Sequence, residues 1–491
     1  MKDLMQDAVL LNADYEGSII LDKPTPATGG TIDVTDKATG EELFKAGLAS
    51  IKDVDAAVAT AHQAQEEWAK KTPVERGDVL REFARLCHVH QEEIGAWIIR
   101  ETGSIPPKAP FEVLTSARDA LGAASLTDQP EGYILSSSFP RESKARRVPL
   151  GVVAVITPWN SPFVLAARVI MPALAMGNGC VLKPDAQTPI CGGYLFAKLV
   201  ELAGAPAGLV TVVPGGGDIG AALCSHPGVN MVSFTGSTAT GRKVGATAGE
   251  NLKKVALELG GNNATIIFPD TDLKAVASAT AFGSFFHQGQ ICFTIGRHLV
   301  HEDVADEYAA ILAEKAANLH VGDPATQQVH LGPMINETQA ARAQDIYDRT
   351  IAQGATAQYA GGREGLMYKP AVVSGVTRDM ALFKEEIFGP IAPITTFKTE
   401  EEAIDLANSV EYGLATSVFT NDLACANRIA NGVKTGIVHI NDQTVVHEVF
   451  GPIGGMGASG NGARSGGPSM ADEYSQWQWI TVNSQIPEYP F

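Results

Sequence analysis

Apolar residues in the first part of the chain follow a helical period. From Asp53 to about Gly103 they recur at intervals of three and four residues, beginning with Val54, Ala57, Val58, Ala61, Ala64 and Trp68. Such spacing places them along one stripe of a helix. Thr72 followed by Pro73 is typical of the start of a further helix, with threonine as the N-cap and proline in the first turn. The segment therefore predicts successive amphipathic helices.

From Val148 the pattern changes to short β-branched runs that alternate with helical stretches. The runs are GVVAVI, GCVLKP, LVTVVPG, MVSFTGS, VALELGG and ATIIF. This alternation predicts an α/β fold with a parallel, doubly wound sheet. Ligands of such sheets bind at the carboxyl ends of the strands. The residues directly after these runs are therefore the first candidates for a functional site.

The rest of the chain repeats this strand–helix alternation and ends in a different pattern. A second series of strands and helices runs from about Ala264 to Gly436, with glycine-rich junctions such as GGREG, and predicts another α/β unit. The tail EYSQWQWITV has the pattern of a strand. A late strand either pairs with another subunit or is added to its own domain. The sequence leaves both possibilities open.

Composition narrows the possible partners. The chain has 491 residues, too many for one ordinary core, with 37 basic and 55 acidic side chains and a net charge of −18. An acidic surface without a basic stripe disfavours nucleic-acid binding. The uncharged stretches are interrupted by Pro, Gly, Asn, Gln or His, and Asp and Glu are scattered through the start of the chain. We therefore expect a soluble protein with no secretion signal and no membrane partner.

The cysteines and histidines indicate the compartment and argue against a metal. Six cysteines are sparse and none forms a CxxC pair, which favours free thiols in a reducing, cytoplasmic setting. The pair His88 and His90 is accompanied by neither an HExxH motif nor a Cys/His ligand quartet. No metal site is predicted.

Five element ends carry polar or special residues: TPWN from Thr157 to Asn160, Lys183-Pro184, FTGS from Phe234 to Ser237, ELGG from Glu258 to Gly261, and Cys292 after FFHQGQ. Singly, most have ordinary interpretations, such as a helix cap, a solvated strand end or a buried thiol. Glu258 has no such ordinary interpretation, because burying a carboxylate inside VALELGG costs several kcal/mol unless it has a partner or a raised pKa.

The stretch FTGSTATG places Gly, Ser and Thr between a strand and an apparent helix. Backbone N–H groups at a helix start favour anions, so a phosphate or pyrophosphate is plausible there. The stretch is neither GxGxxG nor a Walker loop. Alone it is a weak motif.

In combination the motifs resemble those of the NAD(P)-dependent aldehyde dehydrogenase superfamily. TPWN, KP, FTGST, LELGGN, FHQGQIC, EEIFGP and GPIGGMGASG occur in the family's order and spacing, over essentially the whole chain. The resemblance implies a Rossmann-type cofactor domain over 1–126 and 150–260, an α/β catalytic domain over 261–458, and a small oligomerisation β-element over 127–149 and 470–491. It also implies a homodimer or homotetramer in which the tail strand joins a neighbour's sheet.

The resemblance assigns roles that suit the chemistry. Cys292 is expected to be the nucleophile, Glu258 the general base and Asn160 an oxyanion donor, since an aldehyde gives up hydride only after a nucleophile makes it tetrahedral. Lys183 and Glu386 are implied as ribose ligands and Phe388 as a nicotinamide contact. The full implied cofactor set is Thr157, Trp159, Lys183, Gly236, Ser237, Gly241, Glu386 and Phe388.

Cofactor choice is left partly open by one departure from the family pattern. Many NAD-preferring relatives carry Glu three residues after the KP lysine, where it repels a 2′-phosphate, but here the position is Ala186. NAD is expected to work best, with NADP also accepted. Whether the adjacent Asp185 substitutes for the missing carboxylate stays open.

NSPFVLAARV, GASGNGAR and the WQWITV tail resemble the aryl-aldehyde branch, the benzaldehyde, hydroxybenzaldehyde, vanillin and salicylaldehyde dehydrogenases of aromatic catabolism. Arg168 or His447 would then meet a ring hydroxyl inside an aromatic-walled slot. Alternatively, Phe163 and Leu165 are core residues and Arg168 pairs with a surface acid. The residues implied to line the aldehyde tunnel are Phe163, Leu165, Arg168, Ile291, Phe293, His447 and Phe450.

Other functions remain to be distinguished. A short-chain or semialdehyde dehydrogenase would use the same scaffold, whereas a CoA-acylating relative is disfavoured because Glu258 is present to drive hydrolysis. A thiol hydrolase using Cys292 with His287 is an alternative from another class, although closeness in sequence is not pairing in space. A structural or nucleotide-sensing role without catalysis is the third.

Overall fold

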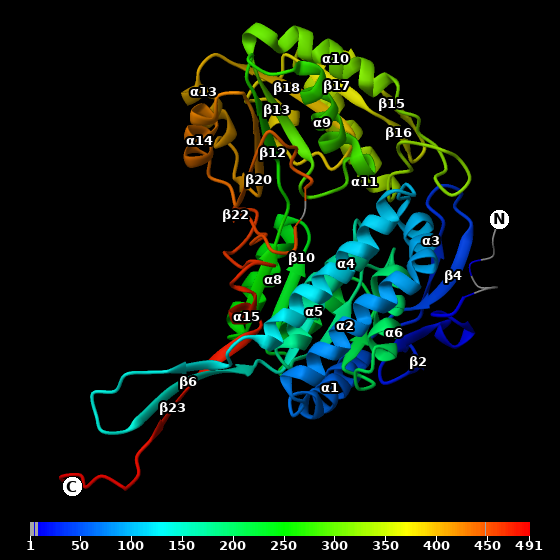
Figure 1. Ribbon diagram of the computed structural model, residues 1–491. Helices are drawn as coiled ribbons and strands as arrows, with labels where there is room; N and C mark the ends of the chain where they lie inside the picture. Colours follow the sequence, from blue (N-terminus) through cyan, green and yellow to red (C-terminus); the bar gives the residue numbers. More distant parts are fainter. Residues whose placement is uncertain (1–3, 5–7, 447) are drawn as a thin grey trace.

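The computed structural model describes residue 4 and residues 8–446 and 448–491. Two seven-stranded sheets with helices packed on them form the body, and a three-stranded ribbon projects away from it (Figure 1). The strand orders are β11-β10-β7-β8-β9-β1-β2 in the first sheet and β14-β17-β18-β13-β12-β20-β21 in the second. The expected α/β fold class is confirmed.

The strands of the first sheet coincide with the predicted runs. Five parallel strands are β7 (Val152–Ile156), β8 (Gly179–Lys183), β9 (Val210–Val212), β10 (Met231–Thr235) and β11 (Lys254–Glu258). β7, β8 and β9 are fully buried and β10 nearly so, as continuous apolar runs of a doubly wound sheet should be, whereas β11 at the sheet edge is only partly buried. Antiparallel strands extend the sheet or form a separate hairpin: β1 (Ser18–Ile20) and β2 (Pro24–Pro26), then β3 (Thr31–Thr35) and β4 (Glu42–Gly47).

The predicted N-terminal helices are present. Thr72 caps α2, with its hydroxyl accepting the N–H of Glu75 at 3.3 Å, and Pro73 is in the first turn. The first helix begins at Ile51, slightly before the expected Asp53, because Ser50 is the cap and the Asp53 carboxylate accepts the Ser50 N–H at 2.8 Å. The helices around the first sheet are α1 (Ile51–Trp68), α2 (Pro73–Val89), α3 (Gln91–Thr102), α4 (Lys108–Ala124), α5 (Pro162–Ala175), α6 (Leu195–Leu202), α7 (Gly217–Ser225) and α8 (Thr238–Glu250).

The second sheet is also mainly parallel. Its strands are β12 (Asn263–Ile267), β13 (Ile295–His301), β17 (Ala371–Ser374), β18 (Ile391–Phe397), β20 (Ala415–Phe419) and β21 (Ile437–Ile440), with β14 (Thr356–Tyr359) antiparallel at one edge. Its helices are α9 (Leu273–Phe285), α10 (Ala305–Ala317), α11 (Glu337–Ala352), α12 (Ala381–Lys384), α13 (Glu400–Ala407) and α14 (Leu423–Gly432).

The projecting ribbon consists of β5 (Gly132–Ile134), β6 (Glu142–Pro149) and the tail strand β23 (Ser475–Val482). β23 runs antiparallel to β6 of its own chain, from Ser475 opposite Pro149 to Val482 opposite Glu142. The rings of Tyr133 and Trp477 stack at 5.5 Å, and Tyr133 and Trp479 are 58% and 64% exposed. The ribbon therefore presents aromatic side chains to its surroundings.

In the part of the chain that the structure describes, no helix is both long enough and apolar enough to span a bilayer.

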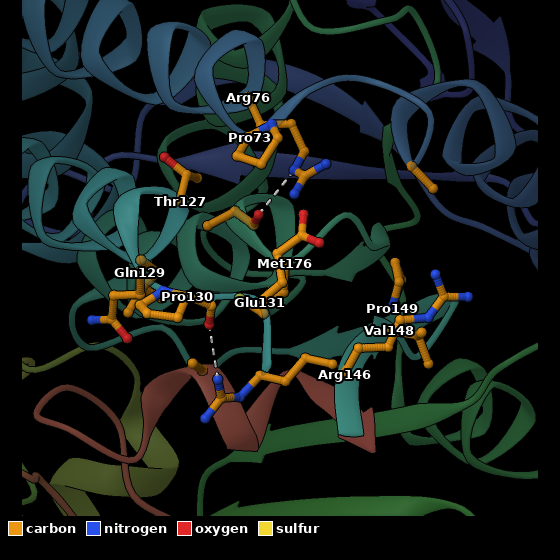
Figure 2. A pocket seen from close by; sticks show the side chains of 15 residues that line it. Pro73, Arg76, Thr127, Gln129, Pro130, Glu131, Arg146, Val148, Pro149 and Met176 are labelled. Atoms are coloured by element: carbon orange, nitrogen blue, oxygen red, sulfur yellow. Dashed lines mark hydrogen bonds between the residues drawn. The ribbon is translucent and has the colours of Figure 1, made fainter. Parts of the chain in front are cut away.

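A cavity of about 290 Å³ lies where the ribbon meets the first sheet's helices (Figure 2). Arg76, Arg146 and Arg147 line it, but each already donates a hydrogen bond, to the Ala175 carbonyl, Gln478 and Asp472 respectively. Its lining includes neither a cysteine nor a histidine. This cavity is distinct from the site described next.

Candidate active site

The carboxyl ends of four adjacent parallel strands bring the predicted polar residues to one edge of the first sheet. Ile156 pairs with both Lys183 and Phe234, and Thr235 pairs with Glu258. Thr157, Lys183, Gly236 and Glu258 therefore follow or end neighbouring strands along that edge. This is where a doubly wound sheet binds ligands.

Cys292 lies in the turn between the short 3-10 helix η4 (Phe286–Gly289) and β13. Asn263 holds this turn through its side-chain amide, which donates to the carbonyls of Cys292 and Thr294, both at 2.7 Å. Cys292 is the only one of the six cysteines that is not fully buried. The thiol is thus fixed at its backbone and reachable at its side chain.

The turn before Cys292 is strained. His287 and Gln288 have φ values of 51° and 57°, in the left-handed region that non-glycine residues rarely adopt. Gln288 locks the turn by donating to the carbonyls of Gly103 at 3.1 Å and Pro333 at 2.6 Å. Strain of this kind persists only where the surroundings enforce it. The FHQGQ segment is therefore built to place Cys292.

Burial and nearby carboxylates keep the thiol protonated at rest. The pKa of Cys292 is raised to about 12, chiefly by burial: the charges of Glu386 and Glu258 also raise it, whereas the positive charge of Arg168 and the Phe293 N–H lower it. A thiol is a weak nucleophile until it loses its proton. Catalysis by Cys292 therefore needs a base.

Glu258 has the properties of that base. Burial raises its pKa to about 8, partly offset by the charges of Arg168 and Arg464. Its Oε1 has no hydrogen-bond partner within the described residues. A carboxylate with a pKa close to the operating pH can take up and release a proton in each turnover.

Asn160 is placed beside the Cys292 turn. Its side-chain Nδ2 donates to the Gln290 carbonyl at 2.9 Å, and the residue is 5% exposed. A primary amide has a second N–H. That N–H is available to a substrate oxygen, as an oxyanion donor requires.

The expected ribose ligands are both buried. Lys183 is 7% exposed and donates to the Pro184 carbonyl at 3.0 Å, and burial lowers the pKa of its ammonium. Glu386 accepts the Gly261 N–H at 2.9 Å, and burial raises its pKa to about 7. A Cβ at Gly260 would lie 2.3 Å from the Glu386 carboxylate, so a larger residue there would require the Glu386 side chain to move.

The remaining predicted cofactor residues divide into two groups. Trp159 and Phe388 meet edge to face at 5.6 Å, and the Thr157 hydroxyl is buried without a hydrogen-bond partner in the described residues. Ser237 caps α8, whose N–H groups face the same sheet edge. Gly241, by contrast, lies one turn inside α8, where an added Cβ would be 2.3 Å from Leu259. Its role in the structure is close packing of helix against strand.

The cavity around Cys292 has a volume of about 50 Å³. Of the expected tunnel residues, Leu165, Arg168, Ile291 and Phe293 line it. The expected catalytic residues Cys292 and Asn160 also line it, and residues that the sequence did not indicate complete it: Lys108, Phe111, Glu112, Thr115, Ser161, Val164, Phe286 and Val445.

Two expected tunnel residues lie elsewhere. Phe163 is fully buried in the core, stacked on Phe83 at 6.4 Å and edge-on to Phe196 at 5.4 Å, so its neighbour Val164 lines the cavity instead. Phe450 is 80% exposed and borders an outer cavity of about 500 Å³. His447 lies outside the described residues.

The outer cavity adjoins the inner one through Thr115, which lines both. Arg118, Leu121, Glu448 and Val449 also border it. A cavity of about 150 Å³ holds benzene, so an aromatic ring beside Cys292 requires lining side chains to move or the ring to extend toward the outer cavity. Thr115 is thus the one lining residue that the two cavities have in common.

Arg168 carries its charge into the middle of the site. It is the only residue of α5 that is not fully buried. Its charge lowers the pKa values of Cys292 and Glu258, and also that of Asp119, a buried acid of α4 whose pKa burial raises to about 7. Asp119 is 6% exposed, so the acid that Arg168 affects here is a buried one.

Comparison with known proteins identifies this arrangement. A model of the Aldehyde dehydrogenase family matches residues 25–480. The chain belongs to this family. Vanillin dehydrogenase of Amycolatopsis sp. is 47% identical over 466 residues, covering 95% of this chain and 96% of that protein. Benzaldehyde dehydrogenase [NAD(+)] of Pseudomonas putida is 46% identical over 478 residues, covering 97% and 98%.

A solved structure supports the same assignment. Betaine aldehyde dehydrogenase of Staphylococcus aureus, in complex with NAD+, has a TM-score of 0.93 at 32% identity, covering 97% of this chain and 96% of that one. As an aldehyde dehydrogenase family member, the chain is an enzyme with a Rossmann-type cofactor domain and a catalytic domain.

The geometry of the site does not support a hydrolase that uses Cys292 with His287. The Nδ1 of His287 lies 3.4 Å from the Ser104 hydroxyl, and its Nε2 has no hydrogen-bond partner within the described residues, so no hydrogen bond joins the ring to Cys292 there. Burial and the charge of Lys108 lower the pKa of His287 well below its usual value. His287 is thus a neutral residue of the polar network behind Asn160 in this aldehyde dehydrogenase.

Proposed function

We propose that this chain oxidises aromatic aldehydes to carboxylic acids with NAD, using Cys292 as the nucleophile. The observation that carries the proposal is that Cys292 and the Asn160 amide line one cavity with mainly apolar walls, while Glu258, a carboxylate of raised pKa, is close enough for its charge to affect Cys292. The names of the benzaldehyde and vanillin dehydrogenases that resemble it support the aromatic substrate.

The residues at the sheet edge suit a dinucleotide. The buried Thr157 hydroxyl, the Lys183 ammonium, the Glu386 carboxylate and the start of α8 together offer donors and acceptors for ribose and phosphate groups. The aromatic pair Trp159 and Phe388 lies beside them. NAD, when bound, supplies the acceptor for the hydride.

The protein's own steps begin with proton transfer. Glu258 removes the proton of Cys292, and the thiolate forms a bond to the aldehyde carbon while the carbonyl π electrons move to oxygen. The Asn160 amide donates a hydrogen bond to this oxyanion. When the oxyanion collapses, the carbon loses hydride and becomes a thioester. Glu258 releases to solvent the proton that it took from Cys292 and then takes a proton from water, whose oxygen adds to the thioester carbon, displaces the thiolate and yields the acid.

Recognition of the ring is assigned to the cavity walls. Leu165, Ile291 and Phe293 give apolar contact, and Arg168 is the cation that a phenolic hydroxyl or phenolate would meet. A site that hydrogen-bonds a hydroxyl discriminates more strongly than one that recognises apolar bulk alone. Hydroxybenzaldehydes should therefore be better substrates than benzaldehyde.

An aldehyde panel with NAD tests the proposal, with reduced cofactor followed at about 340 nm. The kcat/KM of aryl aldehydes should exceed that of acetaldehyde by at least about a hundredfold, equivalent to about 2.7 kcal/mol. Comparable values for acetaldehyde and benzaldehyde would instead support the short-chain or semialdehyde alternative.

We also propose that the chain works in the cytoplasm as a homodimer or homotetramer. The exposed aromatic residues of the ribbon support self-association, since such patches mark interfaces. Six cysteines without a disulfide among the described residues suit a reducing compartment. Light scattering of the purified protein distinguishes the dimer from the tetramer.

A further inference from the structure

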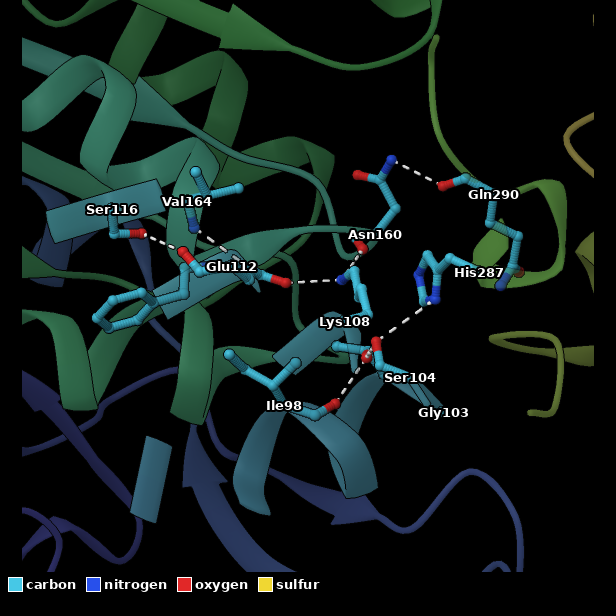
Figure 3. A network of polar contacts seen from close by, with 12 residues as sticks. Ile98, Gly103, Ser104, Lys108, Glu112, Ser116, Asn160, Val164, His287 and Gln290 are labelled. Carbon is cyan, nitrogen blue, oxygen red and sulfur yellow. Dashed lines mark hydrogen bonds and ion pairs between the residues drawn. The ribbon is translucent and has the colours of Figure 1, made fainter. Parts of the chain in front are cut away.

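A buried ion pair lies behind the oxyanion side of the site (Figure 3). Lys108 Nζ and Glu112 Oε2 are 2.6 Å apart, and the two side chains are 2% and 1% exposed. They are one turn apart on α4, and both line the cavity that holds Cys292. A buried ion pair is poor evidence of stability alone, because desolvation offsets the attraction between the charges. Its presence here calls for another explanation.

Both ions have further partners on the segment that carries Asn160. Lys108 Nζ donates to the Asn160 carbonyl at 2.8 Å. Glu112 Oε1 accepts the Phe163 N–H at 2.8 Å and the Val164 N–H at 3.4 Å. These two N–H groups belong to the first turn of α5 and have no acceptor within the helix. A carboxylate is also favoured there by the helix dipole. The pair therefore holds the chain at Asn160 and immediately after it.

This anchoring fixes the Asn160 amide. The backbone carbonyl of the residue is held by Lys108 and its Nδ2 by the Gln290 carbonyl, two residues before Cys292. With one amide hydrogen engaged, the second points in a defined direction. A donor stabilises a developing oxyanion most when it needs no reorganisation during the reaction.

We propose that Lys108 and Glu112 are positioning residues, which hold Asn160 so that its amide meets the oxyanion formed when Cys292 attacks a carbonyl carbon. The inference rests on the proposed function, in which Asn160 is the oxyanion donor. In the assisted step a sulfur–carbon bond forms and the carbonyl π electrons move to oxygen. Lys108 and Glu112 exchange no proton with the substrate, because their charged atoms are engaged with each other and with backbone groups.

Two reagents separate this role from a general structural one. 4-Nitrophenyl acetate acylates a thiol through a tetrahedral oxyanion and releases coloured nitrophenolate. Iodoacetamide alkylates the same thiol by displacing iodide, without an oxyanion. Neither reagent needs NAD or an aldehyde, so an error in the proposed substrate or cofactor leaves the test intact.

The double variant Lys108→Met/Glu112→Gln removes both charges with side chains of similar size. Acylation of Cys292 and kcat for benzaldehyde should each fall at least about tenfold, while KM stays within about threefold and alkylation within about twofold. Asn160→Ala gives the reference loss of about a hundredfold in acylation. Asp36→Asn/Arg100→Met is the matched control, a buried ion pair with no residue in the Cys292 cavity, and should leave both rates unchanged.

An unchanged acylation rate in the double variant would overturn the proposal. So would equal losses with both reagents, because the thiol itself would then be displaced. If thermal unfolding shows that the double variant does not fold, Glu112→Gln replaces it, since it keeps an acceptor for the α5 N–H groups. Its acylation should fall about threefold with alkylation unchanged, and the same two results count against the proposal.

Discussion

At the scale of single residues, the site is set by pKa values that burial raises. Burial raises the pKa of Cys292 to about 12, of Glu258 to about 8 and of Glu386 to about 7. A group with a raised pKa holds its proton over more of the pH range. The resting enzyme therefore contains a thiol and a carboxyl group that must both lose protons before chemistry begins.

The pH dependence of turnover follows from Glu258. Because its pKa is raised to about 8, the basic form is lost as pH falls below that value. We expect kcat to rise about tenfold per unit well below pH 8 and to level off above it. A profile from pH 6 to 10 measures this, with Glu258→Gln as the control in which the rise is absent. A kcat that is flat between pH 6 and 8 in the unchanged enzyme would exclude this base.

Glu258→Gln should also separate the two halves of the reaction. If the carboxylate chiefly activates hydrolytic water, a burst of NADH near one per active site precedes slow turnover. Rapid mixing with absorbance detection shows the burst. Its absence, with slowed alkylation of Cys292, would instead make Glu258 the base for the thiol.

We expect Ala186 to influence the choice between NAD and NADP. Asp185 next to it already raises the pKa of Lys183 through its charge, whereas Ala186 supplies none. Ala186→Glu adds a carboxylate that repels a 2′-phosphate, so kcat/KM with NADP should fall more than with NAD, by about tenfold in the ratio. Ala186→Gln controls for size. Equal losses with both cofactors would mean that this position does not face the ribose.

At the scale of elements, α5 shows where sequence patterns stop being informative. All its residues except Arg168 are buried, so its apolar pattern has no polar face. Periodicity cannot then tell the cavity side, with Val164 and Leu165, from the core side, with Phe163. Only packing against neighbouring helices decides between them.

Substitutions on the two sides of α5 should differ in kind. Phe163→Ala leaves a core cavity and should lower the free energy of unfolding by about 3–5 kcal/mol, with little change in the ratio of kcat/KM values for benzaldehyde and acetaldehyde. Leu165→Ala should change that ratio. Denaturant unfolding and the aldehyde panel measure both effects, and a shifted ratio in folded Phe163→Ala would return Phe163 to the substrate path.

Other features of the site differ in how far the sequence predicts them. The strands at the sheet edge are predictable because continuous β-branched runs are specific to buried parallel strands. The left-handed backbone of His287 and Gln288 is not, since neither residue type signals positive φ. Lys108 and Glu112 have the i, i+4 spacing of an ordinary surface pair. Their apolar neighbours in PPKAPFEV were the only signal that the pair is buried.

At the scale of the whole molecule, the ribbon has aromatic side chains that the rest of its own chain leaves exposed. Trp479 is 64% exposed on β23, far more than a tryptophan that serves only its own core. Trp479→Glu should therefore weaken self-association and shift the scattering mass toward that of one chain. Val74→Glu, at an exposed apolar position of α2, is the control and should leave the mass unchanged. A mass that stays the same in Trp479→Glu would place the interface elsewhere.

The six cysteines differ in burial, and this difference allows the fraction of correctly folded protein to be measured. Cys87, Cys180, Cys191, Cys224 and Cys425 are buried, and only Cys292 is reachable. Burial raises the pKa of every one of the six thiols, so access rather than acidity separates them. A thiol-specific dye should therefore label one site per folded chain and six after denaturation. The ratio of the two readings reports the intact fraction of any preparation without a substrate.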